Sequence, residues 1–384
     1  MTDDKRKIIG QALARVVERA RGGIGRTAIG LMAAGSELGS KELLDGAVLA
    51  QAEDPRLKVT AIGPRTEGYD QLEWIETGDA EADIAAAMEK ALSEGLIAGA
   101  AALHYPFPVG VATVGRVLTP ARGRFMLISS TTGASAAQPL QALALNAVYG
   151  RAVAKSLGAA EPTLGLLNVA GASQTLRVLN LLKEGGYDLR FGLSRRADGG
   201  AILRGNDLLN PGADICLCDS LTGNVLMKLF SAWNTGGAYE ASGWGYGPSV
   251  GQGWNRVVSI ISRASGAPVV AGALKFTAAA VRGGLPEKAA LELAAAEKAG
   301  LNDILASLAP TEAPAQAEIK APPARPAGAE IPGVDVLDMD AAVKSLWKEG
   351  LYAESAMGCT GPVIKVPGDI LEAARDCLKR GRYL

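Results

Sequence analysis

Short runs of apolar residues recur between residues 27 and 308, without the polar alternation of a half-exposed strand, and helical stretches separate them. A strand that is apolar at every position is buried on both faces, as in parallel sheets that helices cover on both sides. The sequence therefore predicts an α/β fold with a mostly parallel sheet between two layers of helices. The predicted strands are residues 27–32, 58–63, 97–103, 125–129, 163–169, 189–193, 215–218 and 268–271, and the predicted helices are residues 40–52, 79–94 and 137–157.

The α/β pattern stops near residue 309, and segments of different character flank it. Residues 309–333 are rich in Pro and Ala, which is typical of a semi-rigid linker; an ordered strap across the domain surface is the alternative. The short segment after it can barely form a core alone. Residues 3–21 are predicted to form a basic amphipathic helix. Three alternatives are open for its apolar side: packing on its own domain, docking a partner, or lying on a membrane. The predicted organisation is an N-terminal helix (1–26), an α/β domain (27–308), a linker (309–333) and a small C-terminal unit (334–384).

The charge balance and the N-terminus bear on where the chain works. Lys and Arg number 39 and Asp and Glu number 40, so the net charge of −1 creates no field that attracts nucleic acid or a membrane surface. Residues 1–10 lack the apolar core and cleavage site of a signal peptide. The most apolar stretch, residues 95–117, contains Pro106 and Pro108, which favour a strand and loop over a spanning helix. We therefore expect a cytoplasmic protein that binds neither nucleic acid nor membrane.

Four cysteines in a chain of 384 residues do not form a disulfide framework, and they indicate a reducing compartment. Cys216 and Cys218 lie two positions apart on a predicted strand, so their side chains share one face. No second pair has zinc-site spacing and the chain has one histidine, so we predict buried thiols and no metal site. That histidine, His104, follows a predicted strand and is either a half-buried structural residue or a general base.

Cys359 differs from the other cysteines because glycines surround it in Gly358-Cys359-Thr360-Gly361. Glycines let backbone N–H groups approach a ligand, and such amides stabilise the oxyanion of an acyl thioester. A thiolate is both a nucleophile and an acyl leaving group. We therefore predict Cys359 as an acyl-accepting nucleophile with Gly358, Thr360 and Gly361 around it. A small residue in a tight turn is the alternative.

Two polar segments follow predicted strands, where parallel sheets bind their ligands. Hydroxyl and amide groups there can hold an anion, although ordinary helix N-caps have the same composition. A third segment, residues 236–254, alternates glycine with aromatic residues and is either a mobile lid or partner-docking loop, or a surface loop that its aromatic residues anchor. The predicted anion-binding residues are Ser129, Ser130, Thr131, Thr132, Gly133, Asp219, Thr222, Gly223, Asn224 and Lys228.

Four stretches carry a family resemblance: DGAVLAQAEDPRLKVTAIG at 45–63, LQALALNAVYGRAVAKSLG at 140–158 with TLGLLNV at 163–169, ADICLCDSLTGNVLMK at 213–228 and GAPVVAG at 266–272. They resemble the phosphate:acyl-carrier-protein acyltransferases, relatives of the phosphotransacetylases. The resemblance implies a Rossmann-like sheet and acyl transfer between a thioester and inorganic phosphate. The chain departs from that family in residues 31–38, which lack the usual aspartates, and in continuing beyond the family's end.

Both departures fit a narrower resemblance over essentially the whole chain, to the α subunit of protein C of the glycine (sarcosine, betaine) reductase complex. It implies that Cys359 receives an acetyl group, which leaves on phosphate as acetyl phosphate, with residues 129–133 and 219–224 in the phosphate-side loops. The implied partners are a thiolase-like β subunit of protein C and a carboxymethylated selenoprotein that donates the group. We expect an oligomer with no cofactor, inorganic phosphate being a substrate.

Two other functions remain open from the sequence. One is a stand-alone phosphate acyltransferase that uses an acyl-carrier protein or acyl-coenzyme A. The other is a non-catalytic scaffold for the thiolase-like partner.

Overall fold

The computed structural model describes residues 25–121, 123–196, 200–308, 319–334, 338–358, 361–381 and 383–384. The predicted helix over residues 3–21, Cys359 and Thr360 lie outside the described residues, as does the first part of the predicted linker. The chain divides into two compact units. Among the described residues, the first holds 25–168 and 175–306, and the second holds 169–174 and the residues from 307 onward.

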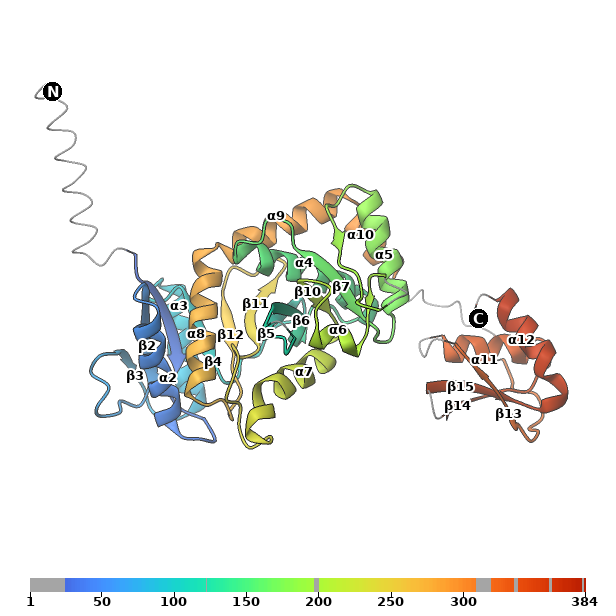
Figure 1. Cartoon of the computed structure of the whole chain (residues 1–384), viewed down its shortest axis with the longest axis horizontal. Coiled ribbons are helices and arrows are strands. Elements are labelled where there is room, and N and C mark those ends of the chain that lie inside the picture. The colour runs from blue at the N-terminus through green and yellow to red at the C-terminus, as the bar shows by residue number, and fades with distance from the viewer. Residues whose placement is uncertain are drawn as a thin grey trace, which may run out of the picture. The chain divides into compact units, whose positions relative to one another are not determined.

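A twelve-stranded sheet runs through the described part of the first unit (Figure 1). Its strand order is β3-β2-β1-β4-β12-β11-β5-β6-β10-β7-β8, and β9 pairs with β7. The strands are β1 (Thr27–Met32), β2 (Leu57–Gly63), β3 (Glu73–Glu76), β4 (Gly99–Ala102), β5 (Val111–Leu118), β6 (Phe125–Ala134), β7 (Thr163–Leu167), β8 (Arg190–Phe191), β9 (Ile202–Leu203), β10 (Ile215–Leu217), β11 (Gly247–Gly251) and β12 (Val258–Ile260).

The sheet is mostly parallel, as the sequence predicts, but its centre is not. Strands β1, β2 and β4 pair in parallel at one side, and β6, β10 and β7 do so at the other. Between them, β5 pairs antiparallel with both β6 and β11, and β11 pairs antiparallel with β12. A short connection joins β5 to β6, which suits an antiparallel pair because a parallel pair needs a longer crossover.

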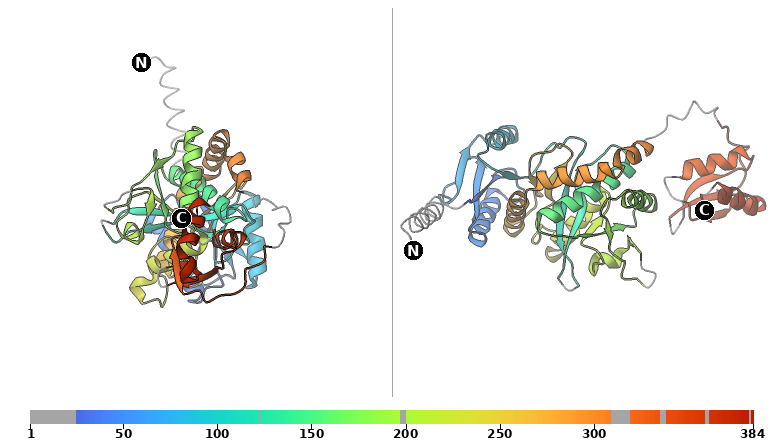
Figure 2. Two further views of the ribbon diagram at one scale, coloured as in Figure 1. Left: turned by 90° about the vertical axis from the view of Figure 1, so that its right-hand side faces the viewer. Right: turned by 90° about the horizontal axis from the view of Figure 1, so that it is seen from above.

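Helices cover both faces of the sheet (Figure 2). Successive side chains of a strand point to opposite faces of the sheet, and here the side chains on both faces are apolar and buried. Ile29 and Leu31 of β1 pack with α2 and α8, whereas Met32 packs with Met88 of α3 on the other face. The helices of this unit are α2 (Ser40–Glu53), α3 (Glu81–Ser93), α4 (Pro139–Ser156), α5 (Ala172–Glu184), α6 (Gly205–Leu209), α7 (Ser220–Ala232), α8 (Ala267–Arg282), α9 (Leu285–Lys298) and α10 (Leu301–Ser307).

One predicted strand is wrong: residues 268–271 form the first turn of α8. Pro268 occupies a first-turn position of the helix, where its missing N–H costs nothing. Val269, Val270 and Ala271 are all buried, because α8 packs against both α2 and the sheet. A helix buried on most of its surface reads as a continuous apolar run, which periodicity alone cannot distinguish from a strand.

The second unit has an antiparallel three-stranded sheet in the order β13-β15-β14. Its elements are β13 (Ala329–Pro332), α11 (Met339–Lys348), β14 (Glu354–Gly358), β15 (Gly361–Val366) and α12 (Leu371–Arg380). Ile331 of β13 is buried in the core of this unit with Leu346, Ile364 and Leu378. The predicted linker therefore ends before Ala329. Strand β13 is short and lies at the edge of its sheet, where Pro332 is tolerated, so its composition resembles that of a Pro/Ala linker. This resemblance explains why the sequence predicts a linker as far as residue 333.

No helix within the described residues is both long enough and apolar enough to span a membrane.

Candidate functional site

The fold brings the two predicted anion-binding segments together beside β10. Cys218, just after β10, donates its N–H to Ser129 O at 2.8 Å, and Ser130 N donates to Cys218 O at 3.2 Å. Helix α7 then lies against β6: a Cβ added at Gly223 would be 1.8 Å from Ser130 O, so the approach requires glycine. Asn224 Nδ2 donates to Thr131 O at 3.3 Å. Residues 129–133 and 219–224 are therefore neighbours in space.

Residues 129–133 are not the loop that the sequence predicts, because β6 continues to Ala134 and pairs with β5 along this stretch. The buried hydroxyls have partners inside the protein. Ser129 Oγ donates to Asn146 O at 2.8 Å, and Thr131 Oγ1 donates to Tyr246 O at 2.5 Å. The hydroxyl of Thr113 on β5 bonds those of Thr131 and Thr132. These hydrogen bonds let a polar run stay inside the sheet, and they occupy the hydroxyls expected to face a ligand.

Asp219 caps α7 with its side chain. Its Oδ1 accepts from Thr222 N at 2.9 Å, and its Oδ2 accepts from Thr222 Oγ1 at 2.6 Å. This is the ordinary N-cap arrangement, in which a carboxylate satisfies a first-turn N–H and favours the positive end of the helix dipole. The cap places a negative charge at the helix start, which disfavours a second anion at that point. Donors farther along α7 are the better candidates for an anion.

Asn146 of α4 holds this region together, although it is not among the residues predicted from the sequence. Its side chain is buried, and its Nδ2 donates to Ser130 Oγ at 3.3 Å and to Cys218 O at 3.2 Å. Its Oδ1 accepts from the hydroxyl of Ser135. The available signal was a single amide in the apolar run LALNAVYG, because a polar residue buried in a helix needs partners.

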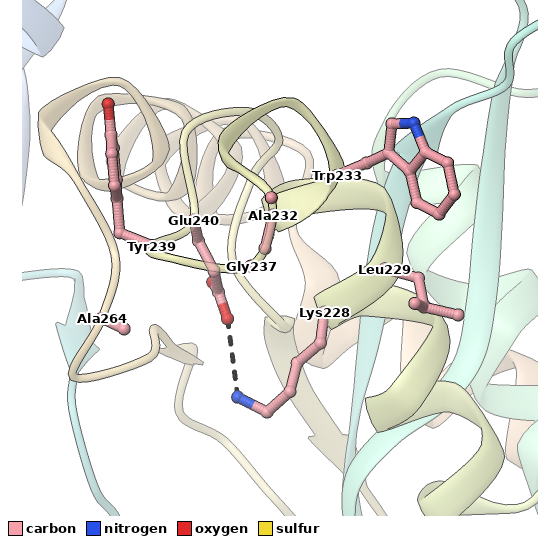
Figure 3. Close-up of a pocket in the computed structure, with 9 residues that line it drawn as sticks. Lys228, Leu229, Ala232, Trp233, Gly237, Tyr239, Glu240 and Ala264 are labelled. Carbon is pink, nitrogen blue, oxygen red and sulfur yellow. Dashed lines mark ion pairs between the residues drawn. The ribbon is translucent and has the colours of Figure 1, made fainter.

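Lys228 of α7 lines a cavity of about 520 Å³ together with Glu240 and Tyr239. Its Nζ lies 3.6 Å from Glu240 Oε1, and the buried Glu240 also accepts hydrogen bonds from Tyr246 and Ser265. Burial, reinforced by the neighbouring Glu240 carboxylate, raises the pKa of Tyr246. Figure 3 shows Lys228 reaching toward Glu240, while Leu229 and Trp233 point away from this ion pair.

The segment rich in glycine and aromatic residues is built into the sheet. Strand β11 lies within it, between β5 and β12, and Glu240 forms a bridge with Ser265. A Cβ at Gly247 would lie 1.8 Å from Val114 O, so the backbones approach closely there. Of the two alternatives for residues 236–254, the anchored one fits the structure.

The three described cysteines are free and buried. Burial raises the pKa of the Cys216 thiol to about 12, and it raises the pKa of Cys218 well above its ordinary value. Burial also raises the pKa of Cys377 in α12. The prediction that Cys216 and Cys218 are core thiols is confirmed. Gly358 and Gly361, on either side of the undescribed Cys359 and Thr360, pair with each other as the adjoining ends of β14 and β15.

His104 follows β4 and is exposed, so the first of its two predicted roles, a half-buried structural residue, is wrong. In the part of the chain that the structure describes, no three His, Cys, Asp or Glu side chains are grouped so as to hold a metal ion.

Comparison with known proteins adds to this geometry. The sequence matches the family described as fatty acid synthesis protein over residues 27–365. Subunit alpha of component C of the glycine/sarcosine/betaine reductase complex from Peptoclostridium acidaminophilum is 44% identical over 380 residues, covering 98% of each chain. The phosphate acyltransferase of Phenylobacterium zucineum is 27% identical over 174 residues, covering 43% of this chain and 45% of that protein. A branched-chain phosphotransacylase from Enterococcus faecalis aligns with a TM-score of 0.47 and 18% identity, covering 66% of this chain and 99% of that one. The chain therefore belongs to the fatty acid synthesis protein family and, within it, to the family of the component C α subunits of glycine/sarcosine/betaine reductase complexes.

Proposed function

We propose that this chain transfers an acetyl group from a thioester on Cys359 to inorganic phosphate, giving acetyl phosphate, as a subunit of a glycine/sarcosine/betaine reductase-type complex. The observation that carries the proposal is the 44% identity to the component C α subunit over 98% of both chains. The phosphate acyltransferase relatives support acyl transfer to phosphate as the reaction class.

The step balances without an oxidant or reductant. A phosphate oxygen attacks the thioester carbonyl carbon, a C–O bond forms, the C–S bond breaks, and the electron pair leaves on the Cys359 sulfur. Phosphate is already a nucleophile and a thioester is already activated, so holding the two together accounts for most of the rate. Backbone N–H groups beside Gly358 and Gly361 would stabilise the oxyanion.

Phosphate would bind along the side of α7 that meets β6. Asn224 and Lys228 are four residues apart, so they lie one turn apart on the same side of the helix. The amide of Asn224 uses one N–H for Thr131 O, and Lys228 has three donors of which Glu240 requires one. One amide N–H of Asn224 and two ammonium N–H groups of Lys228 therefore remain for an anion, beyond the Asp219 cap.

The assignment of the thiol rests on exclusion among the four cysteines. Cys216, Cys218 and Cys377 are buried with raised pKa values, so their thiolate forms are scarce at neutral pH. Cys359 is the remaining cysteine in the sequence. The partners we propose are a thiolase-like β subunit and a selenoprotein acyl donor, with no cofactor and a cytoplasmic location.

The test uses the reverse reaction, because any catalyst of phosphorolysis also acylates its thiol from acetyl phosphate. We expect mass spectrometry to find the added acetyl group on the peptide that contains Cys359. Cys359→Ser should abolish this labelling and acetyl phosphate formation, and Cys377→Ser should leave both intact. Acetylation of Cys216, or full turnover by Cys359→Ser, would reject the proposal. Acyl phosphate formation from acyl-coenzyme A by Cys359→Ser would instead identify a stand-alone phosphate acyltransferase.

A further inference from the structure

Glu240 is a buried carboxylate beside the proposed phosphate donors. Its side chain is 5% exposed and lines the same cavity of about 520 Å³ as Lys228, whose Nζ lies 3.6 Å from Glu240 Oε1. Figure 3 shows the two charged ends pointing toward each other. A phosphate that Lys228 holds would therefore lie next to a negative charge, and that charge bears on which anions the site accepts.

The main chain around Glu240 is fastened on two sides. Glu240 N donates to Ala264 O at 2.9 Å, and Gly266 N donates to Glu240 O at 2.9 Å, which ties the residue to the segment after β12. Ala241 N donates to Ser231 O at 2.9 Å, which ties it to the end of α7. The carboxylate therefore has a fixed place in the wall of the cavity, and a ligand that enters the cavity meets it there.

The carboxylate of Glu240 retains acceptor capacity. Tyr246 Oη donates to its Oε1 at 2.8 Å, and Ser265 Oγ donates to its Oε2 at 3.1 Å. An ionised carboxylate can accept about four hydrogen bonds, so these two hydroxyls use about half of its sites. The 3.6 Å from Lys228 Nζ is longer than the roughly 2.7–2.9 Å of a charge-assisted hydrogen bond. Glu240 can therefore still accept from an O–H group of a ligand.

Oxyanions of the same shape differ in whether they carry such an O–H group. Inorganic phosphate keeps at least one proton at neutral and mildly alkaline pH, whereas sulfate keeps none. A fixed carboxylate accepts a hydrogen bond from the O–H of phosphate. Facing sulfate, the same carboxylate meets only unprotonated oxygens, which repel it, because like charges in contact are costly. A negative charge in the wall of an anion site thus discriminates by the proton of the ligand.

We propose that Glu240 is a specificity-determining residue that makes the site accept protonated oxyanions, phosphate and its analogue arsenate, and reject sulfate. The inference rests on the proposed function, because it takes Asn224 and Lys228 as the phosphate donors. These donors attract every oxyanion alike, and Glu240 adds the repulsive element that separates them. Discrimination between ligands commonly needs both an attractive and a repulsive element.

The first test compares ligands on the wild-type full chain, so it does not depend on the folding of any variant. Titration calorimetry at mildly alkaline pH would use phosphate and sulfate, which then have the same charge, and arsenate and selenate as a second matched pair. We expect phosphate and arsenate to bind at least about tenfold more tightly than sulfate and selenate, because only they satisfy the buried acceptor. Equal affinities for phosphate and sulfate would overturn the proposal.

The second test changes the carboxylate. Glu240→Gln should bind sulfate more tightly and bring the ratio of the two affinities toward one, because the amide removes the charge and offers an N–H. Glu67→Gln is the matched control: it removes the same charge from an exposed position after β2 and should keep the wild-type ratio. Circular dichroism melting checks that both variants fold.

Lys228→Ala separates this inference from the proposed phosphate site. It should weaken the binding of phosphate and sulfate together. If it leaves phosphate affinity unchanged, the proposed site and this inference both fail. If it weakens phosphate binding while Glu240→Gln keeps the wild-type ratio, the site stands and only the role of Glu240 is refuted.

Discussion

At the scale of single residues, the region around α7 combines groups with settled structural roles and groups that retain unused donors. Ser129, Thr131 and Asp219 each spend their side-chain oxygens on hydrogen bonds within the protein. Asn224 and Lys228 have side-chain N–H donors beyond those that they use for Thr131 O and Glu240. Mutations at the first kind of position should therefore lower the stability of the fold, whereas mutations at the second kind should weaken phosphate binding.

Asn224→Ala is the sharpest of these mutations. We expect it to raise the KM for phosphate about tenfold or more with a small loss of stability, because a hydrogen bond to a charged group contributes about 1.5–3 kcal/mol. Initial rates at varied phosphate concentration measure the change. Asn302→Ala, on the exposed surface of α10, is the control and should leave KM unaltered. Unchanged phosphate dependence in Asn224→Ala would move the phosphate site elsewhere.

At the scale of elements, the contact between α7 and β6 depends on Gly223. Gly223→Ala should lower the free energy of unfolding by about 1–3 kcal/mol, because its Cβ would meet the Ser130 carbonyl at 1.8 Å and the helix would have to move. Gly205→Ala, at the start of α6, is the matched control, since a Cβ there meets nothing within 4 Å. Urea unfolding of both variants measures the difference. Equal stabilities would show that α7 is loosely seated on the sheet.

A buried ionic cluster joins α4 to α9. Glu292 of α9 accepts from Arg151 Nε at 3.0 Å and from the Tyr187 hydroxyl at 2.6 Å, and it pairs with Lys155. Burial pushes the pKa of Glu292 up, but the hydrogen bonds from Lys155, Tyr187 and Arg151 outweigh burial and hold this pKa below its ordinary value. A lowered pKa stabilises the fold above the ordinary value of 4.5, and that contribution is lost as the pH falls toward the folded-state pKa.

Glu292→Gln should therefore destabilise the protein most at neutral pH. We expect a loss of about 3–5 kcal/mol at pH 7, because the buried Arg151 would keep its charge and lose its buried carboxylate partner, with only the exposed Asp188 left at 3.6 Å. The difference from wild type should shrink in acid, where Glu292 is protonated in the wild type as well. Urea unfolding at neutral and acid pH checks this sign, and Glu287→Gln, exposed on the same helix, is the control. A difference that grows in acid would contradict the assignment.

The elements that the sequence predicts correctly are those whose burial is uniform. Strands β1, β2 and β10 are buried at nearly every position and lie where predicted, and Cys216 is buried because β10 is flanked by β6 and β7. Strand β6 extends past its predicted end because hydrogen bonds from distant residues, Thr113 and Asn146, satisfy its hydroxyls. Local composition cannot encode partners that are so far away in the sequence. The same holds for the site, where Asn146 and Glu240 act only through the packing of other elements.

At the scale of the whole molecule, the chain carries two separate cores. The second unit has its own sheet, two helices and a buried cluster that includes Ile331, Leu346 and Ile364. We expect residues 319–384, produced alone, to fold with a cooperative thermal transition, although a unit of this size has modest stability. Circular dichroism melting measures the transition. A flat melting curve would mean that this unit needs the rest of the chain to fold.

The pairing of β13 with β15 changes how far the second unit can travel from the first. Arg325 already forms an ion pair with Asp369, and β13 follows it, so the predicted linker comprises at most residues 309–324 instead of 309–333. Fully extended, that length spans about 55 Å, whereas the longer segment would span about 85 Å. Effective concentration falls roughly as the −3/2 power of linker length, so a flexible linker over residues 309–324 would give about twice the local concentration that one over residues 309–333 would give.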